Sequence, residues 1–459
     1  MQDIQRRYEE LLARARAVGQ EHVFRYWQEL TASQKASLLT EVAGLDFERI
    51  KRLVRDCVVK ATAFGLPKEI KPAPFYPAAP GDGRQEAFYR QAWEAGEQAL
   101  RDGKVCAFTV AGGVGTRLGF DGPKGCYRIG PVTGKTLFQL FAEYLLHCRR
   151  RYRETIRWYI MTSRANHQAT GDFFQANNYF GLPADAVGFF EQGMMPAFGP
   201  DGKLLLDQKY ALALSPDGHG GSLRALRASG TLAEMKRLGI EHLSYFQVDN
   251  PLVRCLDPHF IGLHVLAGSE MSSKSVPKAE DKEKVGNFVV GDGKLMVIEY
   301  LDLPDRFAYA KDPDGSRTFD AGSIAIHAIA RTFVERITED DLQLPYHRAV
   351  KKVPYVNEQG RRVDPSEPNA VKLEQFVFDA IPLARNAIVV ETVRKEEFSP
   401  VKSETGVDSA ETARRDLIAR ASRWLERAGV SVALDPQTHQ PFPIEISPLR
   451  AIFPDDLAR

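Results

Sequence analysis

A glycine-rich stretch that carries two cations is the part of this sequence whose residue types most clearly indicate chemistry. It reads TVAGGVGTRLGFDGPKG over residues 109–125 and contains Arg117 and Lys124. Because Gly112 and Gly113 lack a Cβ, the backbone there can approach a base or a phosphate closely and take positive φ values. Exposed N–H groups in such a turn form an anion-binding concavity. The arginine offers a planar fork for phosphate oxygens and the lysine a movable point charge. The stretch therefore predicts a phosphate-binding loop.

Two common phosphate loops do not fit the sequence. The dinucleotide fingerprint G-x-G-x-x-G requires a third glycine where Leu118 stands. The segment GPVTGKT at residues 130–136 is similar to a P-loop, but Ile129 occupies the position of its first glycine. We therefore interpret residues 109–125 as a glycine loop of a third kind.

The elements that must hold this loop form an alternating pattern. Apolar runs ending in glycine or polar residues occur at 104–113, 155–163 and 242–250, and an amphipathic stretch at 136–152 lies between the first two. Strands that alternate with amphipathic helices predict an α/β fold with a doubly wound, mixed but mainly parallel sheet. Ligands of such sheets bind at the carboxyl ends of the strands, where the glycine loop lies.

The rest of the chain predicts three segments. Residues 1–80 are expected to form an N-terminal helical cap, with Asp46 capping one helix, followed by a proline-rich linker. Residues 81–400 are expected to form the catalytic domain. Residues 401–459, with one helix and then short strands, are expected to form a small C-terminal α+β lobe.

Composition excludes several classes of partner. The 459 residues carry a formal net charge of +1, which provides no overall field for nucleic acid or an anionic membrane. No apolar run reaches the roughly 18 residues of a membrane span, and the five cysteines form no CxxC pair. We expect a cytoplasmic protein with neither a nucleic-acid nor a membrane partner.

Several further segments are similar to those of a known family and occur in its order. They read EQGMMPAF, SPDGHGGSLRAL, YFQVDNPLVRCLDPHFIG, FDAGSIAIH, PNAVKLEQFVFD and EEFSPVK. With the glycine loop, they resemble the eukaryotic-type UDP-sugar pyrophosphorylases from about residue 85 almost to the C-terminus. The resemblance is closest to the N-acetylglucosamine branch. It implies a Rossmann-like nucleotidyltransferase fold and a uridylyltransferase that converts UTP and a sugar 1-phosphate into UDP-sugar and pyrophosphate.

That reaction needs no general base, because the attacking phosphate oxygen is already anionic. It needs in-line positioning and positive charge around the triphosphate. Catalytic roles are expected for Arg117, Lys124 and Lys402. Because Lys402 lies just before the C-terminal lobe, a further hypothesis is that movement of the lobe delivers or withdraws it. It implies that Asp249 binds Mg²⁺, with phosphate oxygens and waters completing the shell. The implied nucleotide contacts are Ala111, Gly112, Gly113, Val114, Gln192, Gly218 and Lys372.

The sugar is less well specified. His219 and Asp320 stand where the N-acetylglucosamine branch has asparagines, whereas Glu299 and Tyr300 match its sugar contacts. A histidine can bind the hydroxyls of a hexose that has no acetamido group. The expected substrate is N-acetylglucosamine 1-phosphate, and the alternative is a UDP-glucose or broad-specificity UDP-sugar pyrophosphorylase.

Two other classes of function fit the sequence less well. A nucleotide-sugar-consuming glycosyltransferase usually presents D-x-D for its metal, and the segment VDNPL at 248–252 has no second carboxylate. A non-catalytic paralogue that only binds a nucleotide sugar is a second alternative, which the presence of all four candidate cations and Asp249 disfavours.

Overall fold

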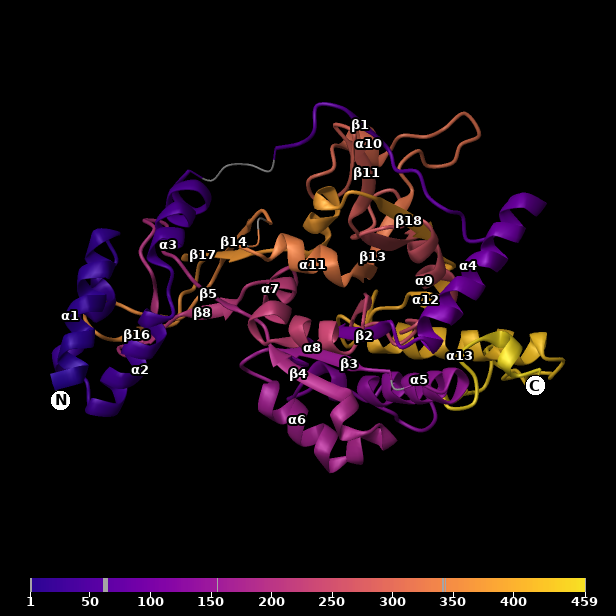
Figure 1. Ribbon diagram of the computed structural model, residues 1–459, viewed down its shortest axis with the longest axis horizontal. Helices are drawn as coiled ribbons and strands as arrows, with labels where there is room; N and C mark the ends of the chain where they lie inside the picture. Colours follow the sequence, from indigo (N-terminus) through magenta and orange to yellow (C-terminus); the bar gives the residue numbers. More distant parts are fainter. Residues whose placement is uncertain (1, 61–64, 155, 341, 343, 459) are drawn as a thin grey trace. The chain divides into compact units, whose positions relative to one another are not determined.

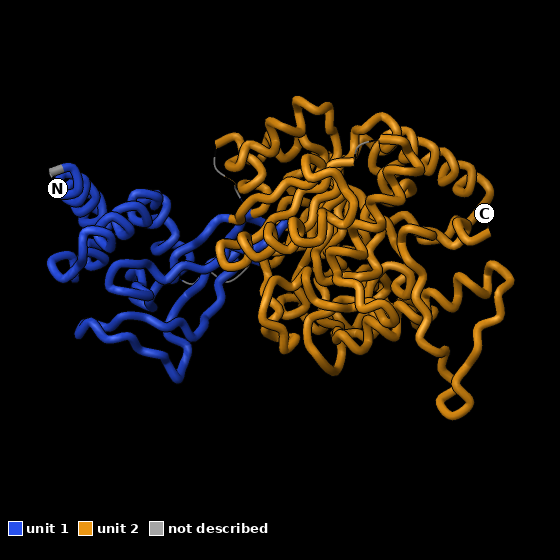
Figure 2. Tube along the Cα trace, turned by 90° about the horizontal axis from the view of Figure 1, so that it is seen from below, with its two compact units in different colours: residues 1–65, 193–221, 344–377 blue, residues 66–192, 222–343, 378–459 orange. Residues whose placement is uncertain are grey.

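The computed structural model describes residues 2–60, 65–154, 156–340, 342 and 344–458. The chain divides into two compact units, which Figure 2 distinguishes by colour. Unit 1 consists of residues 1–65, 193–221 and 344–377, and unit 2 of residues 66–192, 222–343 and 378–459. The helical N-terminal segment thus shares its unit with two segments from the middle of the chain, and residues 401–459 share theirs with the central sheet.

The central sheet of unit 2 has a parallel half that positions the glycine loop. In order, it contains β9 (His242–Gln247), β2 (Val105–Val110), β3 (Trp158–Thr162) and β4 (Val187–Glu191). Val110, the last residue of β2, lies opposite Met161 of β3 and Gln247 of β9. The three strands therefore end at one edge, which is the edge at which open α/β sheets bind ligands.

The other half of the sheet is mostly antiparallel. The long strand β13 (Ala321–Ala330) runs antiparallel to β9, β10 (Met271–Pro277) and β11 (Asn287–Gly291). The remaining strands are β1 (Ile70–Pro72), β12 (Lys294–Ile298) and β18 (Ala387–Glu391), of which β18 is parallel to β10. The predicted α/β class with a mixed sheet is confirmed. Its parallel pairs are those of β9–β2–β3–β4 and of β10–β18.

Helices cover the parallel half. The predicted helix at 136–152 is α5 (Leu137–Tyr152), capped by Thr136, and its Phe138 and Phe141 pack in the core on Trp158 and Phe246. Figure 1 shows α5 and α6 on one side of β3 and β4 and α8 on the other. Helix α7 (Gly221–Ala228) begins at the last residue of the unit 1 segment 193–221. The other helices of unit 2 are α4 (Gly83–Arg101), α6 (His167–Ala176), α8 (Thr231–Arg237), α9 (Pro258–Leu266), α10 (Asp305–Ala308), α11 (Arg331–Ile337), α12 (Arg394–Glu397) and α13 (Ala410–Arg427).

The C-terminal segment differs from its prediction. The expected helix is α13, but the expected short strands are absent from residues 430–458, where the one β-bridge pairs Leu434 with Pro441. Prolines at 436, 441, 443 and 448 explain the difference, because a proline has no N–H to donate to a strand ladder.

Unit 1 joins the N-terminal helices to small hairpins. Its helices are α1 (Gln2–Ala17), α2 (Ala32–Ala43) and α3 (Phe47–Leu53), and the Asp46 side chain accepts from Arg49 N–H as predicted. Its strands form pairs: β5 (Met194–Pro196) with β8 (Leu214–Pro216), β6 (Leu206–Gln208) with β7 (Ala211–Leu212), β14 (His347–Lys351) with β17 (Ala370–Glu374), and β15 (Tyr355–Val356) with β16 (Arg362–Val363). One apolar core, which includes Trp27, Leu38, Phe198 and Leu373, joins the helices to these hairpins. Across the described residues of both units, every helix is too short or too polar to cross a membrane.

Candidate active site

The glycine loop leaves the end of β2 and is held by its carbonyl groups. Asn166 Nδ2 donates to Ala111 O at 2.8 Å and to Gly113 O at 3.1 Å, and Ser163 Oγ donates to Gly112 O at 2.7 Å. Both side chains belong to the segment that joins β3 to α6. Because the carbonyl oxygens point into the protein, the N–H groups of the same peptides are turned the other way.

Three consecutive amides of this loop are available to a ligand. The N–H groups of Gly112, Gly113 and Val114 have no hydrogen-bond acceptor among the residues that the structure describes. Lys124 N–H donates back to Gly113 O at 3.1 Å, which closes the loop. Adjacent unpaired N–H groups form an anion-binding or base-binding concavity. The predicted nucleotide contacts of these residues stay a prediction.

Gln192 lies against this loop. The residue is 8% exposed, and its backbone N–H donates to Thr162 O at 2.9 Å at the end of β3. Its side-chain Oε1 lies 2.2 Å from the point that a Cβ on Gly112 would occupy. Only glycine permits this approach, so the loop and the Gln192 amide form one surface.

The predicted metal ligand and one predicted cation meet at the same strand edge. Asp249 follows β9, and its Oδ2 lies 3.4 Å from Lys124 Nζ. The two side chains are 14% and 17% exposed, so the pair lies at a partly covered surface. The glycine loop and the end of β9 are thereby brought together as the sequence predicted.

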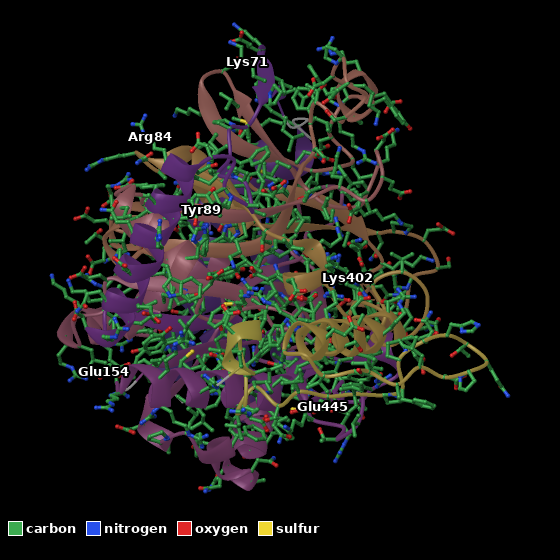
Figure 3. The ribbon with its side chains drawn as sticks, turned by 90° about the vertical axis from the view of Figure 1, so that its right-hand side faces the viewer. Lys71, Arg84, Tyr89, Glu154, Lys402 and Glu445 are labelled. Atoms are coloured by element: carbon green, nitrogen blue, oxygen red, sulfur yellow. The ribbon has the colours of Figure 1, made fainter. Side chains whose placement is uncertain are left out.

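Lys402 reaches this edge through its backbone. Val401 N–H donates to Asp249 O at 2.8 Å, which places the following residue beside the end of β9. The Lys402 ammonium itself pairs with Asp408 Oδ2 at 3.0 Å and is 45% exposed. Figure 3 shows Lys402 on the segment that precedes α13. The carboxyl group of Glu404 lies near Gly119, so this segment also borders the glycine loop.

Arg117 is the least constrained of the predicted cations. It lies in a short 3-10 helix, Thr116–Leu118, with an exposed side chain. Within the described part of the chain it has no ion-pair partner. Its predicted role on a phosphate stays a prediction.

A divalent cation would receive few protein ligands here. Within the described residues, no group of three or more His, Cys, Asp or Glu side chains is arranged to hold a metal. Asp249, which contacts Lys124 of the glycine loop, is the predicted ligand. Mg²⁺ in nucleotide sites is typically held by one or two carboxylates together with substrate phosphates and waters. Asp249 together with phosphate oxygens and waters is a donor set that fits Mg²⁺ carried by a nucleotide, and this ligand stays a prediction.

The predicted sugar residues of unit 2 lie at strand ends of the antiparallel half. Glu299 and Tyr300 follow β12 and are half-buried. Asp320 precedes β13, and its Oδ1 accepts from Lys278 N–H at 3.1 Å and from Arg317 Nη1 at 3.3 Å. These bonds show that Asp320 also holds the turn before β13, and its contact with a sugar stays a prediction.

Gly218, His219 and Lys372 belong to unit 1. Gly218 has φ +85° and packs on the backbone of Gln375, which leaves no room for a side chain. This glycine therefore allows a close approach to Gln375, just after β17, and its nucleotide contact stays a prediction. Lys372 is half-buried on β17, opposite Ala349.

The His219 ring is fixed in one tautomer. Its Nδ1 accepts from Val377 N–H at 3.1 Å, and its ring stacks on Phe376 with centroids 5.1 Å apart. Burial, and to a lesser degree the charge of His347, lower the pKa of His219 to about 4. At neutral pH the ring is uncharged, and because Nδ1 is an acceptor the proton is on Nε2.

Sequence reasoning missed three residues that shape the site. Ser163 and Asn166 follow β3, and polar residues at the end of a buried parallel strand were a usable signal for them. Asp408, which pairs with Lys402, was not anticipated. Its backbone has φ +55°, a value that non-glycine residues rarely adopt, so the flanking sequence does not predict its pairing with Lys402.

Comparison with known proteins assigns the family. A family model described as UTP–glucose-1-phosphate uridylyltransferase matches residues 84–444. The chain belongs to this uridylyltransferase family.

Relatives within the uridylyltransferase family match nearly the whole chain. A human protein named UDP-N-acetylhexosamine pyrophosphorylase-like protein 1 is 38% identical over 96% of this chain and 92% of its own length. The UDP-N-acetylglucosamine pyrophosphorylase of Saccharomyces cerevisiae is 37% identical over 90% of each chain. Among solved structures, the uridine diphosphate N-acetylglucosamine pyrophosphorylase of Trypanosoma brucei has a TM-score of 0.84 and 26% identity, covering 98% of this chain and 94% of its own. These matches confirm the predicted family and the predicted α/β nucleotidyltransferase fold.

Proposed function

We propose that this protein transfers the uridylyl group of UTP to a sugar 1-phosphate, giving UDP-sugar and pyrophosphate, with N-acetylglucosamine 1-phosphate as the sugar substrate. The observation that carries the proposal is the joint placement of Lys124, Asp249 and three unpaired amides at one strand edge. The printed names of the most similar relatives, which are N-acetylhexosamine and N-acetylglucosamine pyrophosphorylases, support the choice of sugar.

Each group has a part in this reaction. The amides of Gly112, Gly113 and Val114 bind the nucleotide, with the amide of Gln192 pairing with the donor and acceptor of uracil. Lys124, Arg117 and Lys402 bind the phosphate oxygens of the two substrates, which otherwise repel each other. An oxygen of the sugar phosphate then forms a bond to the α-phosphorus of UTP as the bond to the leaving pyrophosphate breaks in line with it.

Asp249 would be the protein ligand of Mg²⁺, which when bound supplies positive charge to the phosphate oxygens. The Lys124–Asp249 contact of 3.4 Å is longer than a usual charge-assisted hydrogen bond, which suits a pair that separates to bind a nucleotide–metal complex. The attacking oxygen is already ionised, so none of these side chains has to remove a proton.

The alternative sugar follows from His219 and Asp320. Nε2–H of His219 is a hydrogen-bond donor at neutral pH, since its Nδ1 is occupied. A histidine in place of the asparagine of the N-acetylglucosamine branch can bind the hydroxyls of a hexose that has no acetamido group. A UDP-glucose or broad-specificity pyrophosphorylase is therefore the second candidate.

A substrate panel tests both candidates. The purified full-length protein is incubated with UTP, Mg²⁺ and, separately, the 1-phosphates of N-acetylglucosamine, N-acetylgalactosamine, glucose and galactose, and pyrophosphate release is measured. We expect the largest kcat/KM with N-acetylglucosamine 1-phosphate. A larger value with glucose 1-phosphate would transfer the assignment to the second candidate. No release with any sugar, together with binding of UDP-sugar by calorimetry, would identify a non-catalytic binding protein.

A further inference from the structure

A buried cluster of four charges lies within unit 2, beside the candidate site but not part of it. Lys274 Nζ lies 2.5 Å from both Asp257 Oδ2 and Glu397 Oε2. Arg254 Nη1 lies 3.5 Å from Glu397 Oε1, which also accepts from Thr392 Oγ1 at 2.6 Å. The side chains of Lys274 and Glu397 are each 1% exposed. Three of the four charges, those of Lys274, Asp257 and Glu397, are therefore almost completely removed from water, whereas the side chain of Arg254 is 22% exposed.

Such a cluster holds its members in fixed positions. Burial alone would raise the pKa of Asp257, but the charges of Lys274 and Arg254 outweigh it and hold that pKa well below its usual range. Buried charges persist only where each has its partner, so a displaced member leaves another one unpaired in a medium of low polarity. Glu397 is accordingly held by buried partners on both of its carboxylate oxygens.

The chain that follows Glu397 leads directly to the candidate site. Asn250 Nδ2 donates to Glu397 O at 2.7 Å, and Val401 N–H donates to Asp249 O at 2.8 Å. Segment 397–401 is thus fixed to the residues that end β9 and carry the predicted metal ligand. The next residue along the chain is the predicted cation Lys402, which is labelled in Figure 3.

We infer that Glu397 is a positioning residue, which through its buried pairing with Lys274 fixes the place of Lys402 relative to Asp249. The inference rests on the proposed function. Glu397 contacts no substrate itself, and its effect is carried by the backbone of segment 397–401. Because a misplacement of about 1 Å can cost roughly 100-fold in rate, a small shift of this segment should be measurable.

Asp257 provides a matched control within the same cluster. It pairs with the same ammonium at the same distance, but its main chain continues into α9. The chain before it has separate anchors, because Ser244 Oγ donates to Cys255 O at 2.7 Å and Tyr144 Oη donates to Leu256 O at 2.9 Å. Asp257→Asn therefore disturbs the same cluster at a residue whose own main chain does not lead to Lys402.

The experiment compares Glu397→Gln with Asp257→Asn in the full-length protein. Each variant removes one negative charge and keeps the shape of its side chain. We expect similar losses of Tm in both. We expect kcat to fall about 10-fold or more in Glu397→Gln with KM for UTP within about threefold, and both constants to stay within about threefold in Asp257→Asn. Hydrogen exchange of the peptide covering 398–402 should become faster only in Glu397→Gln.

Equal kcat and equal exchange in the two variants would overturn the inference, since the cluster would then serve stability alone. Wild-type protein that releases no pyrophosphate would instead contradict the proposed function, and the exchange comparison would still decide the positioning. If Glu397→Gln does not fold, the double variant Lys274→Met/Glu397→Gln removes one charge of each sign. A folded double variant with reduced kcat or faster exchange supports the inference, and one that behaves like wild type in both overturns it.

Discussion

Gly112 and Gln192 allow the nucleotide site to be tested without removing a charge. A Cβ added at Gly112 would lie 2.2 Å from Gln192 Oε1, whereas ordinary van der Waals contact begins at 3.4 Å. The amide must therefore move by about 1.2 Å, which is the difference of those two distances. The atom displaced is the end of a flexible side chain, so Gly112→Ala should fold with little loss of Tm.

Gly112→Ala should weaken the binding of UTP much more than it lowers Tm. If the Gln192 amide makes two hydrogen bonds to uracil, each worth about 0.5–1.5 kcal/mol, its displacement costs about 1–3 kcal/mol. That range corresponds to an increase of about 5- to 150-fold in the Kd for UTP. Calorimetric titration with UTP measures the change directly. Gly171→Ala is the matched control, because a Cβ on that helical glycine meets nothing within 4 Å.

The double variant gives the decisive comparison. If Gly112→Ala acts by moving Gln192, then Gly112→Ala/Gln192→Ala should bind UTP no more weakly than the weaker single variant. Additive losses would show that the two residues act independently. Unchanged Kd values in both single variants would refute the assignment of this surface to uracil.

Two further predictions concern catalysis and stability. Arg117→Ala and Lys402→Ala should each reduce turnover, measured by pyrophosphate release, roughly 100-fold. Their Tm should not change, because both side chains lie at the surface. Arg84→Ala removes an exposed cation on α4 and should leave turnover unchanged, whereas near-normal turnover in the first two variants would contradict their role. Burial, with a further effect of His242, lowers the pKa of His264 to about 3. As the pH falls from about 6.5 toward 3, this histidine is therefore protonated in the unfolded state but not in the folded state, and the free energy of unfolding decreases. At pH 5 this costs about 2 kcal/mol, and urea unfolding at pH 7.5 and 5 should show a loss smaller by that amount in His264→Asn than in wild type.

The sequence was sufficient to predict those parts of the site that depend on a single strand end. Asp249 and the glycine loop each follow a buried apolar run, and such runs of a parallel sheet end at one edge. Their contact was therefore predictable from local pattern and topology alone.

The parts that the sequence did not predict depend on partners distant in the chain. Asn166 holds the carbonyl groups of Ala111 and Gly113, which are 55 and 53 residues away. Unit 1 is assembled from three separate segments, whose shared apolar core joins residues as distant as Leu38 and Leu373. Neither periodicity nor turn chemistry encodes such pairings, because each segment alone is compatible with many neighbours.

The structure also explains why, of the two glycine-containing loops at residues 109–125 and 130–136, only the first is suited to bind a nucleotide. In the P-loop-like segment 130–136, the N–H groups of Val132 and Thr133 donate to Glu445 Oε2 at 3.0 and 2.9 Å, and Thr133 Oγ1 donates to Glu445 Oε1 at 2.6 Å. A carboxylate from the C-terminal segment thus occupies the place that a phosphate takes in a P-loop. In the loop after β2, the amides from Gly112 to Val114 have no such acceptor among the described residues. Both loops contain glycines and present adjacent N–H groups, so neither feature distinguishes a nucleotide-binding loop from the other one. What distinguishes them is whether the protein already supplies the anion.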